Sequence, residues 1–393
     1  MADEKRPFII MAKPVGSRCN MHCSYCYYLD KGKYSRHKEQ KCMSPALLEQ
    51  LIRQTIAANE GPVVSFTWHG GEPTLAGLPF YKKVIELEKR YLPRGWQVWN
   101  NLQTNGLLLD ENWCQFLAKN HFDVGLSIDG SQAVHDVNRR DLGGKGTWER
   151  VSRVVLNLQK AGIQPDLLCT VNAESCKDPL GVYQALRDFG TEWIQFIPIV
   201  VRLEDGSLAP ESVTPEGYGD FLCRIFDEWM AHDLGKCDVQ LFAETARIWA
   251  GGEASLCWMS PTCGRVLIAE EDGGIYACDH FVDHEHRRGT LGRERLSAMA
   301  NSPAQITFGN AKQDNLTREC RECPWKSCCN GACPKDRFGY SQDGEPGQYY
   351  LCKGLKTFFA HAREPLEKAM ELSSRGMAPE QIMEYFRQMG EET

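Results

Sequence analysis

The chain has 393 residues, of which 42% are hydrophobic and 10% aromatic, and its formal net charge is −7. This composition predicts a globular protein with one large and one smaller domain, and the acidic balance argues against general binding to nucleic acid or to an anionic membrane surface. Because no apolar run approaches the ~20 residues of a membrane span and the charged N-terminus lacks the apolar stretch of a signal peptide, we expect a cytoplasmic protein.

Short apolar runs that favour β-strands alternate with helical patterns over the first two-thirds of the chain. The runs are residues 8–13, 63–68, 98–104, 124–129, 167–171 and 193–200. Residues 44–59 combine a capping Ser44, Pro45 at the first helical position and helical spacing of apolar residues. Repeated β/α units predict parallel strands with helical crossovers. Since six units are two short of a closed eight-fold barrel, we expect an α/β fold with a partial (β/α)6 barrel over residues 1–240.

Polar or glycine-rich segments follow four of these strands. They are SRCNMHCSYCYYL at 17–29, HGGEP at 69–73, QTNG at 103–106 and SIDG at 127–130. Because reactive groups in such folds lie at the C-terminal ends of the strands, the four segments predict one common site.

The first of these segments contains a closely spaced set of cysteines. They form a C-x3-C-x2-C motif of Cys19, Cys23 and Cys26. In the cytoplasm, clustered cysteines more often bind metal or carry out redox chemistry than form disulfides. Three thiolates can ligate three irons of a [4Fe–4S] cluster and leave the fourth iron open. The alternative is a structural zinc with His22 or His69 as a distant fourth ligand.

This motif, followed by the aromatic Tyr27, resembles that of the radical S-adenosylmethionine superfamily. The resemblance implies that the amino and carboxylate groups of S-adenosylmethionine chelate the open iron. It further implies a set of cofactor contacts: Tyr28, Gly70, Gly71, Glu72, Ser127 and Arg153. Arg150 lies one helical turn from Arg153, so the sequence does not separate these two candidates for the contact with the cofactor carboxylate.

A second, denser group of cysteines lies in the C-terminal third. Eight of them have the spacing C-x5-C-x14-C, then C-x2-C-x5-C-x3-C, and a last cysteine after a gap. Eight thiolates are enough for two further, fully ligated [4Fe–4S] clusters, and two zinc ribbons are the structural alternative. The pattern resembles the SPASM extension of radical S-adenosylmethionine enzymes, which we expect over residues 241–370, with a helical tail over 371–393.

The SPASM pattern also implies how the eight thiolates are divided. The cluster nearer to the active site takes Cys257, Cys263, Cys278 and Cys333. The outer cluster takes Cys320, Cys323, Cys329 and Cys352. Cys328 interrupts the spacing and is interpreted as a bystander. Together with the first motif, the resemblance therefore implies three [4Fe–4S] clusters.

Over nearly the whole chain the sequence resembles the anaerobic sulfatase-maturating enzymes, most clearly in GGIYACDHFV at 273–282. There Asp279 follows Cys278 at the position of that family's catalytic base. The resemblance implies oxidation of a cysteine or serine to Cα-formylglycine in an unfolded or nascent sulfatase with a C/S-x-P/A-x-R segment. A 5′-deoxyadenosyl radical would remove a Cβ hydrogen, Asp279 would take the thiol or hydroxyl proton, and the second electron would leave through the nearer auxiliary cluster. A flavodoxin- or ferredoxin-like reductant would supply the first electron.

Two alternatives to a sulfatase-maturating enzyme remain open at this stage. A radical enzyme of the same architecture cross-links, epimerises or forms a thioether in a ribosomally made peptide. A non-catalytic cluster protein carries electrons, although a carrier gains little from an open iron. Separately, the alternative to a catalytic role for Asp279 is that it caps a turn or pairs with Arg287 or Arg288. The sequence does not distinguish a cysteine from a serine target.

Overall fold

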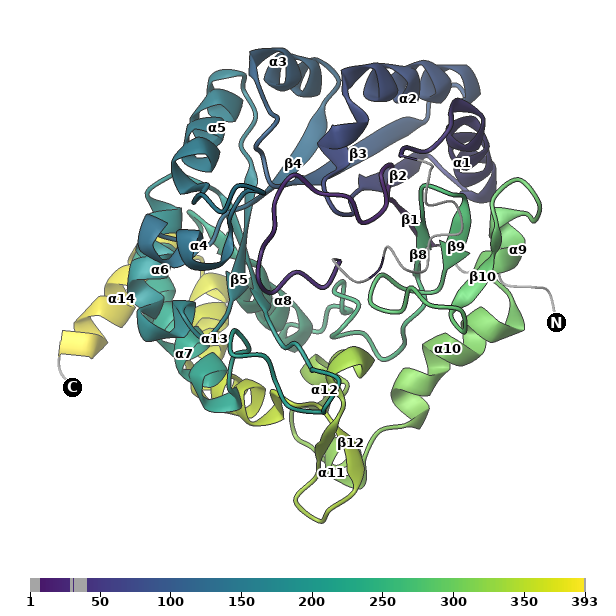
Figure 1. Ribbon diagram of the computed structural model, residues 1–393. Helices are drawn as coiled ribbons and strands as arrows, with labels where there is room; N and C mark the ends of the chain where they lie inside the picture. The colour runs from purple at the N-terminus through teal and green to yellow at the C-terminus, as the bar shows by residue number, and fades with distance from the viewer. Residues whose placement is uncertain (1–7, 29–30, 32–40, 392–393) are drawn as a thin grey trace. The chain divides into compact units, whose positions relative to one another are not determined.

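The computed structural model describes residues 8–28, 31 and 41–391 (Figure 1). The chain divides into two compact units. Unit 1 comprises Met1–Ser127, Arg139–Pro165 and Thr262–Ala311. Unit 2 comprises Ile128–Asn138, Asp166–Pro261 and Lys312–Thr393. The domain boundaries expected near residues 240 and 370 stay predictions.

Unit 1 contains the first four predicted strands, which pair in parallel in chain order. They are β1 (Ile9–Ala12), β2 (Val63–Trp68), β3 (Gln97–Thr104) and β4 (Phe122–Ser127). The helices of this β/α series are α1 (Pro45–Ala58), α2 (Leu78–Tyr91), α3 (Glu111–Lys119) and α5 (Trp148–Lys160). In Figure 1, α1, α2 and α3 lie along the outer side of these strands. The parallel strands with helical connections confirm the predicted α/β class.

The helix predicted at residues 44–59 is α1, and its start follows from local chemistry. The Ser44 side chain accepts a hydrogen bond from the backbone N–H of Leu47, and Pro45 occupies the first helical position. Its apolar positions, including Leu48 and Ile52, are buried. The periodic apolar spacing therefore identifies the face that packs in the core.

Three further strands extend the sheet of unit 1 on the other side of β1. They are β8 (Val266–Ala269), β9 (Gly274–Tyr276) and β10 (Arg287–Thr290). β8 pairs in parallel with β1, placing Ala269 opposite Ala12, while β9 and β10 are antiparallel. These strands were not among the predicted ones, because they are short and lie among the cysteines of the C-terminal third. Their pairing brings a late part of the chain beside the first strand.

Unit 2 contains the other predicted strands and most of the C-terminal helices. Its parallel strands are β5 (Asp166–Val171), β6 (Trp193–Pro198) and the unpredicted two-residue β7 (Asp238–Val239). Its longer helices are α6 (Pro179–Arg187), α7 (Pro215–His232), α8 (Gln240–Trp249), α13 (Cys352–Ser374) and α14 (Pro379–Glu391). Its short elements are α4 (Gln132–Asn138), α11 (Arg318–Arg321), α12 (Lys326–Cys329), β11 (Gly339–Tyr340) and β12 (Pro346–Gln348). The remaining helices are α9 (Leu296–Ala300) in unit 1 and α10 (Pro303–Asp314).

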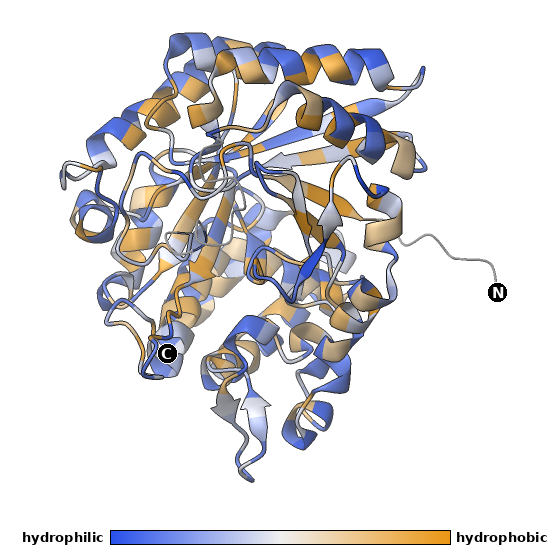
Figure 2. Ribbon diagram, turned by 45° about the vertical axis from the view of Figure 1, so that its right-hand side comes forward, coloured by the Kyte–Doolittle hydropathy of each residue, from blue (hydrophilic) through white to orange (hydrophobic). Residues whose placement is uncertain are grey.

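Each unit buries an aromatic core. In unit 1, Tyr81 packs edge-on against Trp68 and Trp113. In unit 2, Phe226 and Phe358 pack around Phe242. Figure 2 shows hydrophobic residues along the strands and an alternation of hydrophobic and hydrophilic residues along the helices. Among the described residues, no helix has both the length and the apolar character needed to cross a membrane.

Candidate active site and cluster-binding segments

The loop that follows β1 carries the three cysteines of the first motif, and the glycine-rich end of β2 supports it. The backbone N–H of Gly71 donates to the carbonyl oxygen of Gly16 at 2.9 Å, and that of Glu72 donates to Arg18 at 2.8 Å. A Cβ atom at Gly71 would lie 2.2 Å from the Arg18 carbonyl oxygen, and one at Gly70 would lie 2.7 Å from that of Gly16. The two glycines are therefore required for the close approach of two backbones. Their predicted contact with the cofactor stays a prediction.

Glu72 is fully buried and links the ends of β2 and β3 to this loop. Its carboxylate accepts hydrogen bonds from the backbone N–H of Thr74, the Thr104 hydroxyl and the backbone N–H of Asn105 at 3.0, 2.7 and 2.8 Å. The Asn105 side-chain amide in turn donates to the Cys19 sulfur at 3.5 Å. Burial raises the pKa of Glu72, although the hydrogen bonds oppose this shift. The structure thus gives Glu72 a supporting role beside its predicted cofactor contact.

Two opposing effects act on the Cys19 thiol in this loop. Burial raises the pKa of Cys19 to about 11, while the backbone N–H of Met21, 3.4 Å from its sulfur, favours the thiolate. Iron removes this proton on binding. Within the described residues no three His, Cys, Asp or Glu side chains converge on a single metal ion. A four-iron cluster instead takes one thiolate from each of several cysteines around its larger core.

The segment after α4 packs against the cysteine loop within unit 1. The backbone N–H of His22 donates to the carbonyl oxygen of Arg140 at 2.9 Å. The guanidinium of Arg139, which is only 7% exposed, lies 5.6 Å from the centre of the Tyr25 ring. A buried arginine over an aromatic ring anchors this segment, and Arg139 was not among the predicted site residues.

The two arginine candidates occupy different surroundings. Arg150 forms an ion pair with Asp141 at 3.0 Å, in the segment that packs on the cysteine loop. Arg153 is exposed and lies outside the buried face of α5. Ser127, at the end of β4, accepts a hydrogen bond from the Gln103 amide at 3.1 Å. The cofactor contacts assigned to Arg153 and Ser127 stay predictions.

Asp279 lies at the centre of a hydrogen-bonded network in unit 1. Its Oδ2 accepts hydrogen bonds from the hydroxyls of Tyr27 and Tyr28 at 2.5 and 2.6 Å. Its Oδ1 lies 2.6 Å from the amino group of Lys13. Lys13 is 1% exposed and also pairs with Glu270 at 2.9 Å. The structure therefore brings the predicted base against the loop of the first cysteine motif.

The electrostatics of this network keep Asp279 ionised. Burial by itself would raise the pKa of Asp279, but the nearby charges of Lys13 and Lys31 hold it well below its usual range. The Lys31 amino group donates to the backbone oxygen of Asp279, and burial lowers the pKa of Lys31 to about 8. The pKa of His69 is lowered by burial, and its Nδ1 lies 3.2 Å from the Tyr28 hydroxyl. A largely buried, ionised carboxylate of this kind is a proton acceptor.

The alternative partners proposed for Asp279 are engaged elsewhere. Arg287 donates to the Thr290 hydroxyl at 3.1 Å, and Arg288 donates to the Gln305 side chain at 2.7 Å. Lys13 was not among the predicted site residues, although a lysine directly after an apolar strand is a signal for a strand-end site.

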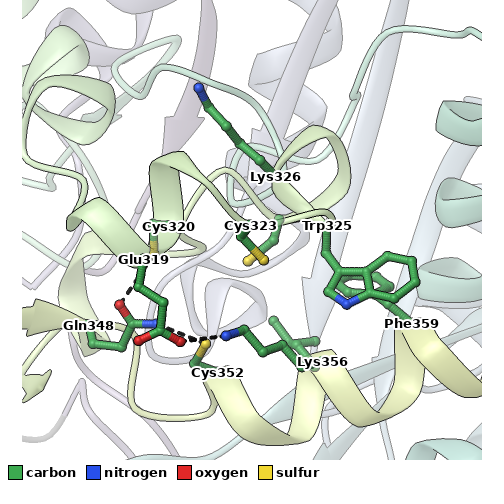
Figure 3. A pocket seen from close by; sticks show the side chains of 12 residues that line it. Glu319, Cys320, Cys323, Trp325, Lys326, Gln348, Cys352, Lys356 and Phe359 are labelled. Carbon is green, nitrogen blue, oxygen red and sulfur yellow. Dashed lines mark hydrogen bonds and ion pairs between the residues drawn. The ribbon is translucent and has the colours of Figure 1, made fainter. Parts of the chain in front are cut away.

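In unit 2, a pocket collects the cysteines that the family pattern assigns to the outer cluster (Figure 3). They are Cys320, Cys323, Cys329 and Cys352. The pocket is also lined by Gln348 and Lys356, and burial raises the pKa of Cys329 to about 12. The neighbouring Cys328 is fully buried and does not line the pocket. Four thiols around one hollow fit a fully ligated [4Fe–4S] cluster.

The other four cysteines of the predicted SPASM pattern are divided between the units, and local contacts hold some of their segments. In unit 2, the buried amino group of Lys312 donates to the backbone oxygens of Cys257 and Trp258 at 2.9 and 2.8 Å. In unit 1, the backbone N–H of Cys263 donates to the oxygen of Gly309 at 3.0 Å. The grouping of Cys257, Cys263, Cys278 and Cys333 on one cluster stays a prediction.

Comparison with known proteins identifies the family. The sequence profile of the Radical SAM superfamily matches residues 14–173. The chain is 39% identical to a serine-type anaerobic sulfatase-maturating enzyme of Bacteroides thetaiotaomicron, over 96% of this chain and 95% of that protein. The chain belongs to the anaerobic sulfatase-maturating enzymes of the radical SAM superfamily.

More distant members of the family agree in sequence and fold. A cysteine-type anaerobic sulfatase-maturating enzyme of Clostridium perfringens is 31% identical over 91% of this chain and 96% of that protein. The solved structure of anSMEcpe with bound AdoMet and Cp18Cys peptide matches with a TM-score of 0.84 and 30% identity, covering 93% of this chain and 99% of that one. The chain is thus a radical SAM enzyme with the α/β fold of this family.

Proposed function

We propose that this enzyme oxidises a cysteine or serine of a sulfatase polypeptide to Cα-formylglycine. The observation that carries the proposal is the ionised Asp279 carboxylate held by Lys13, Tyr27 and Tyr28 beside the first cysteine motif. It occurs in a chain that is 39% identical to a sulfatase-maturating enzyme over almost its full length. The substrate is an unfolded or nascent sulfatase with a C/S-x-P/A-x-R segment.

The cysteine loop fits the cofactors that this chemistry needs. Cys19, Cys23 and Cys26 would hold a [4Fe–4S] cluster with an open iron, and the cluster and S-adenosylmethionine, when bound, supply the radical that removes the Cβ hydrogen. The end of β2 and Asn105 hold this loop by backbone and side-chain hydrogen bonds.

Asp279 takes the substrate's thiol or hydroxyl proton. Tyr27 and Tyr28 already occupy its Oδ2, whereas Oδ1 pairs with Lys13 and makes no further hydrogen bond to the described residues. The low pKa keeps Asp279 ready to accept a proton but makes it a weak base. Loss of the Cβ hydrogen, this proton and the second electron converts serine directly to the aldehyde. From cysteine the same losses give a thioaldehyde, which water hydrolyses to the aldehyde with release of hydrogen sulfide.

Two auxiliary clusters complete the proposed electron path. The outer one is held by the four cysteines of the unit 2 pocket, and the nearer one by Cys257, Cys263, Cys278 and Cys333. The pocket supports the first of these ligand sets, and the family pattern supports both. A flavodoxin- or ferredoxin-like protein supplies the reducing electron in the cytoplasm.

The test is the Asp279→Asn variant, which keeps the size of the side chain and removes the proton acceptor. Radical generation does not need the base, so 5′-deoxyadenosine should still form with substrate peptide present. Formylglycine should fall by ~10²–10⁴-fold, the usual contribution of a general base. Both products are measured in one anaerobic reaction by liquid chromatography and mass spectrometry, with peptides that carry either cysteine or serine.

Asp283→Asn is the matched control, because Asp283 lies in the same loop and bonds His286 instead. This control should leave the ratio of the two products unchanged. Undiminished formylglycine in Asp279→Asn would remove this residue from the mechanism. A parallel fall of both products together with lost iron would show that Asp279 only supports the fold.

A further inference from the structure

Gln348, at the end of β12, contacts two of the four sulfurs in the unit 2 pocket. Its side-chain N–H group donates to the Cys352 sulfur at 3.0 Å, and its Oε1 accepts from the Cys320 thiol at 3.3 Å. Gln348 is 5% exposed, and Figure 3 shows its amide pointing toward both cysteines. One buried amide therefore joins ligands that are far apart in sequence.

A third contact sets the orientation of this amide. The hydroxyl of the buried Thr317 donates to Oε1 of Gln348 at 2.7 Å, and it also caps α11 by accepting from the backbone N–H of Cys320 at 3.2 Å. A cysteine bound to iron has no proton to donate, so Thr317 alone then holds Oε1. The N–H of Gln348 accordingly stays directed at Cys352.

Lys356 also lines the pocket. It is paired with Glu319 at 2.5 Å, which offsets its charge. Reduction of an iron–sulfur cluster adds negative charge that spreads onto its sulfur ligands, and a hydrogen bond to sulfur stabilises that charge.

We propose that Gln348 positions Cys352 and raises the reduction potential of the outer cluster through its N–H···S hydrogen bond. The inference rests on the proposed outer cluster and adds a residue that tunes it. The amide would not bind iron itself. Its loss should therefore lower the reduction potential of the outer cluster while the cluster stays bound.

The experiment is an anaerobic redox titration of the reconstituted full-length enzyme, followed by electron paramagnetic resonance. The signal of the outer cluster is the one missing from a variant with alanine at Cys320, Cys323, Cys329 and Cys352. Gln348→Glu keeps the shape and the bond from Thr317 but loses the N–H donor. Its equilibrium constant for one-electron reduction should fall at least about tenfold, equivalent to ~59 mV. Gln348→Leu should shift the same signal, and Gln342→Leu, at an exposed position of the same hairpin, should not.

The outcomes separate this inference from the proposed cluster. If the four-alanine variant keeps all its iron and all its signals, the outer cluster does not exist and the inference falls with it. If that variant loses one cluster but Gln348→Glu keeps the wild-type potentials, the inference alone is wrong. Loss of about four irons from Gln348→Glu would show a role in cluster retention, which also contradicts tuning.

Discussion

At the scale of single residues, Lys13 is the cation that holds Asp279 in the site. It is almost fully buried and faces two carboxylates, Glu270 and Asp279, at 2.9 and 2.6 Å. A buried cation with two anionic partners is stable only while all of them remain, because removal of one partner leaves uncompensated charge in a poorly solvated place. Lys13 thus holds the orientation of Asp279 and keeps it ionised.

Lys13→Met should therefore affect both stability and product formation. Loss of the cation leaves two buried carboxylates facing each other, with an expected cost of about 3–5 kcal/mol in the free energy of unfolding. The double variant Lys13→Met/Glu270→Gln should regain part of this stability, because it removes one of the unpaired charges. In both variants the ratio of formylglycine to 5′-deoxyadenosine should stay low. A wild-type ratio in the double variant would exclude a role of Lys13 in positioning the base.

At the scale of elements, buried polar contacts lock neighbouring strands and helices together. Glu88 of α2 accepts two hydrogen bonds from the Asn100 amide of β3 at 3.0 and 3.2 Å, and Asn100 accepts one from the Trp68 indole of β2 at 2.7 Å. Burial raises the pKa of Glu88 to about 7. This chain of contacts ties α2 to the two strands whose ends support the cysteine loop.

The raised pKa of Glu88 predicts a pH dependence of stability. The folded state binds this proton more tightly than the unfolded state, whose pKa is near 4.5. The free energy of unfolding should therefore fall as the pH rises from about 4.5 to 7, by about 3 kcal/mol from this group. Glu88→Gln keeps an acceptor for Asn100 and cannot ionise, so its advantage in melting temperature over the wild type should be larger at pH 8 than at pH 5.

Glu86→Gln is the matched control on the same helix, where Glu86 is half-exposed and bonds Lys83 and Arg90 at the surface. Calorimetry under anaerobic conditions at the two pH values measures all three proteins. An equal advantage of Glu88→Gln at both pH values would contradict the assigned ionisation of Glu88.

At the scale of the whole molecule, the proposed clusters predict a definite iron content. The reconstituted enzyme should hold about twelve irons, from three four-iron clusters. Alanine at Cys19, Cys23 and Cys26 should leave about eight irons and abolish cleavage of S-adenosylmethionine. Alanine at the four cysteines of the unit 2 pocket should also leave about eight irons, but cleavage should continue. Iron assay with product analysis distinguishes these cases, and a full iron content in the first variant would refute the radical cluster.

The sequence by itself determined the features that depend on local pattern. Short apolar runs identify strands such as β2, the Ser44 cap identifies the start of α1, and cysteine spacing identifies the ligand-bearing segments. Each of these signals lies within a few residues. The family resemblance, carried by such local motifs, indicated the enzyme class.

Only the tertiary structure decided which distant side chains meet. Pairing of β8 with β1 brings Asp279 against Lys13 and Tyr28, which both lie more than 250 residues earlier in the chain. No local sequence pattern encodes that pairing. In the same way, the structure surrounds Glu72 with hydrogen-bond donors from the segment at the end of β3. It also pairs Arg150 with Asp141 in the segment beside the cysteine loop, whereas Arg153 is exposed. Hydrogen bonds and charges between segments far apart in sequence depend on how the chain packs, and packing is a property of the folded chain as a whole.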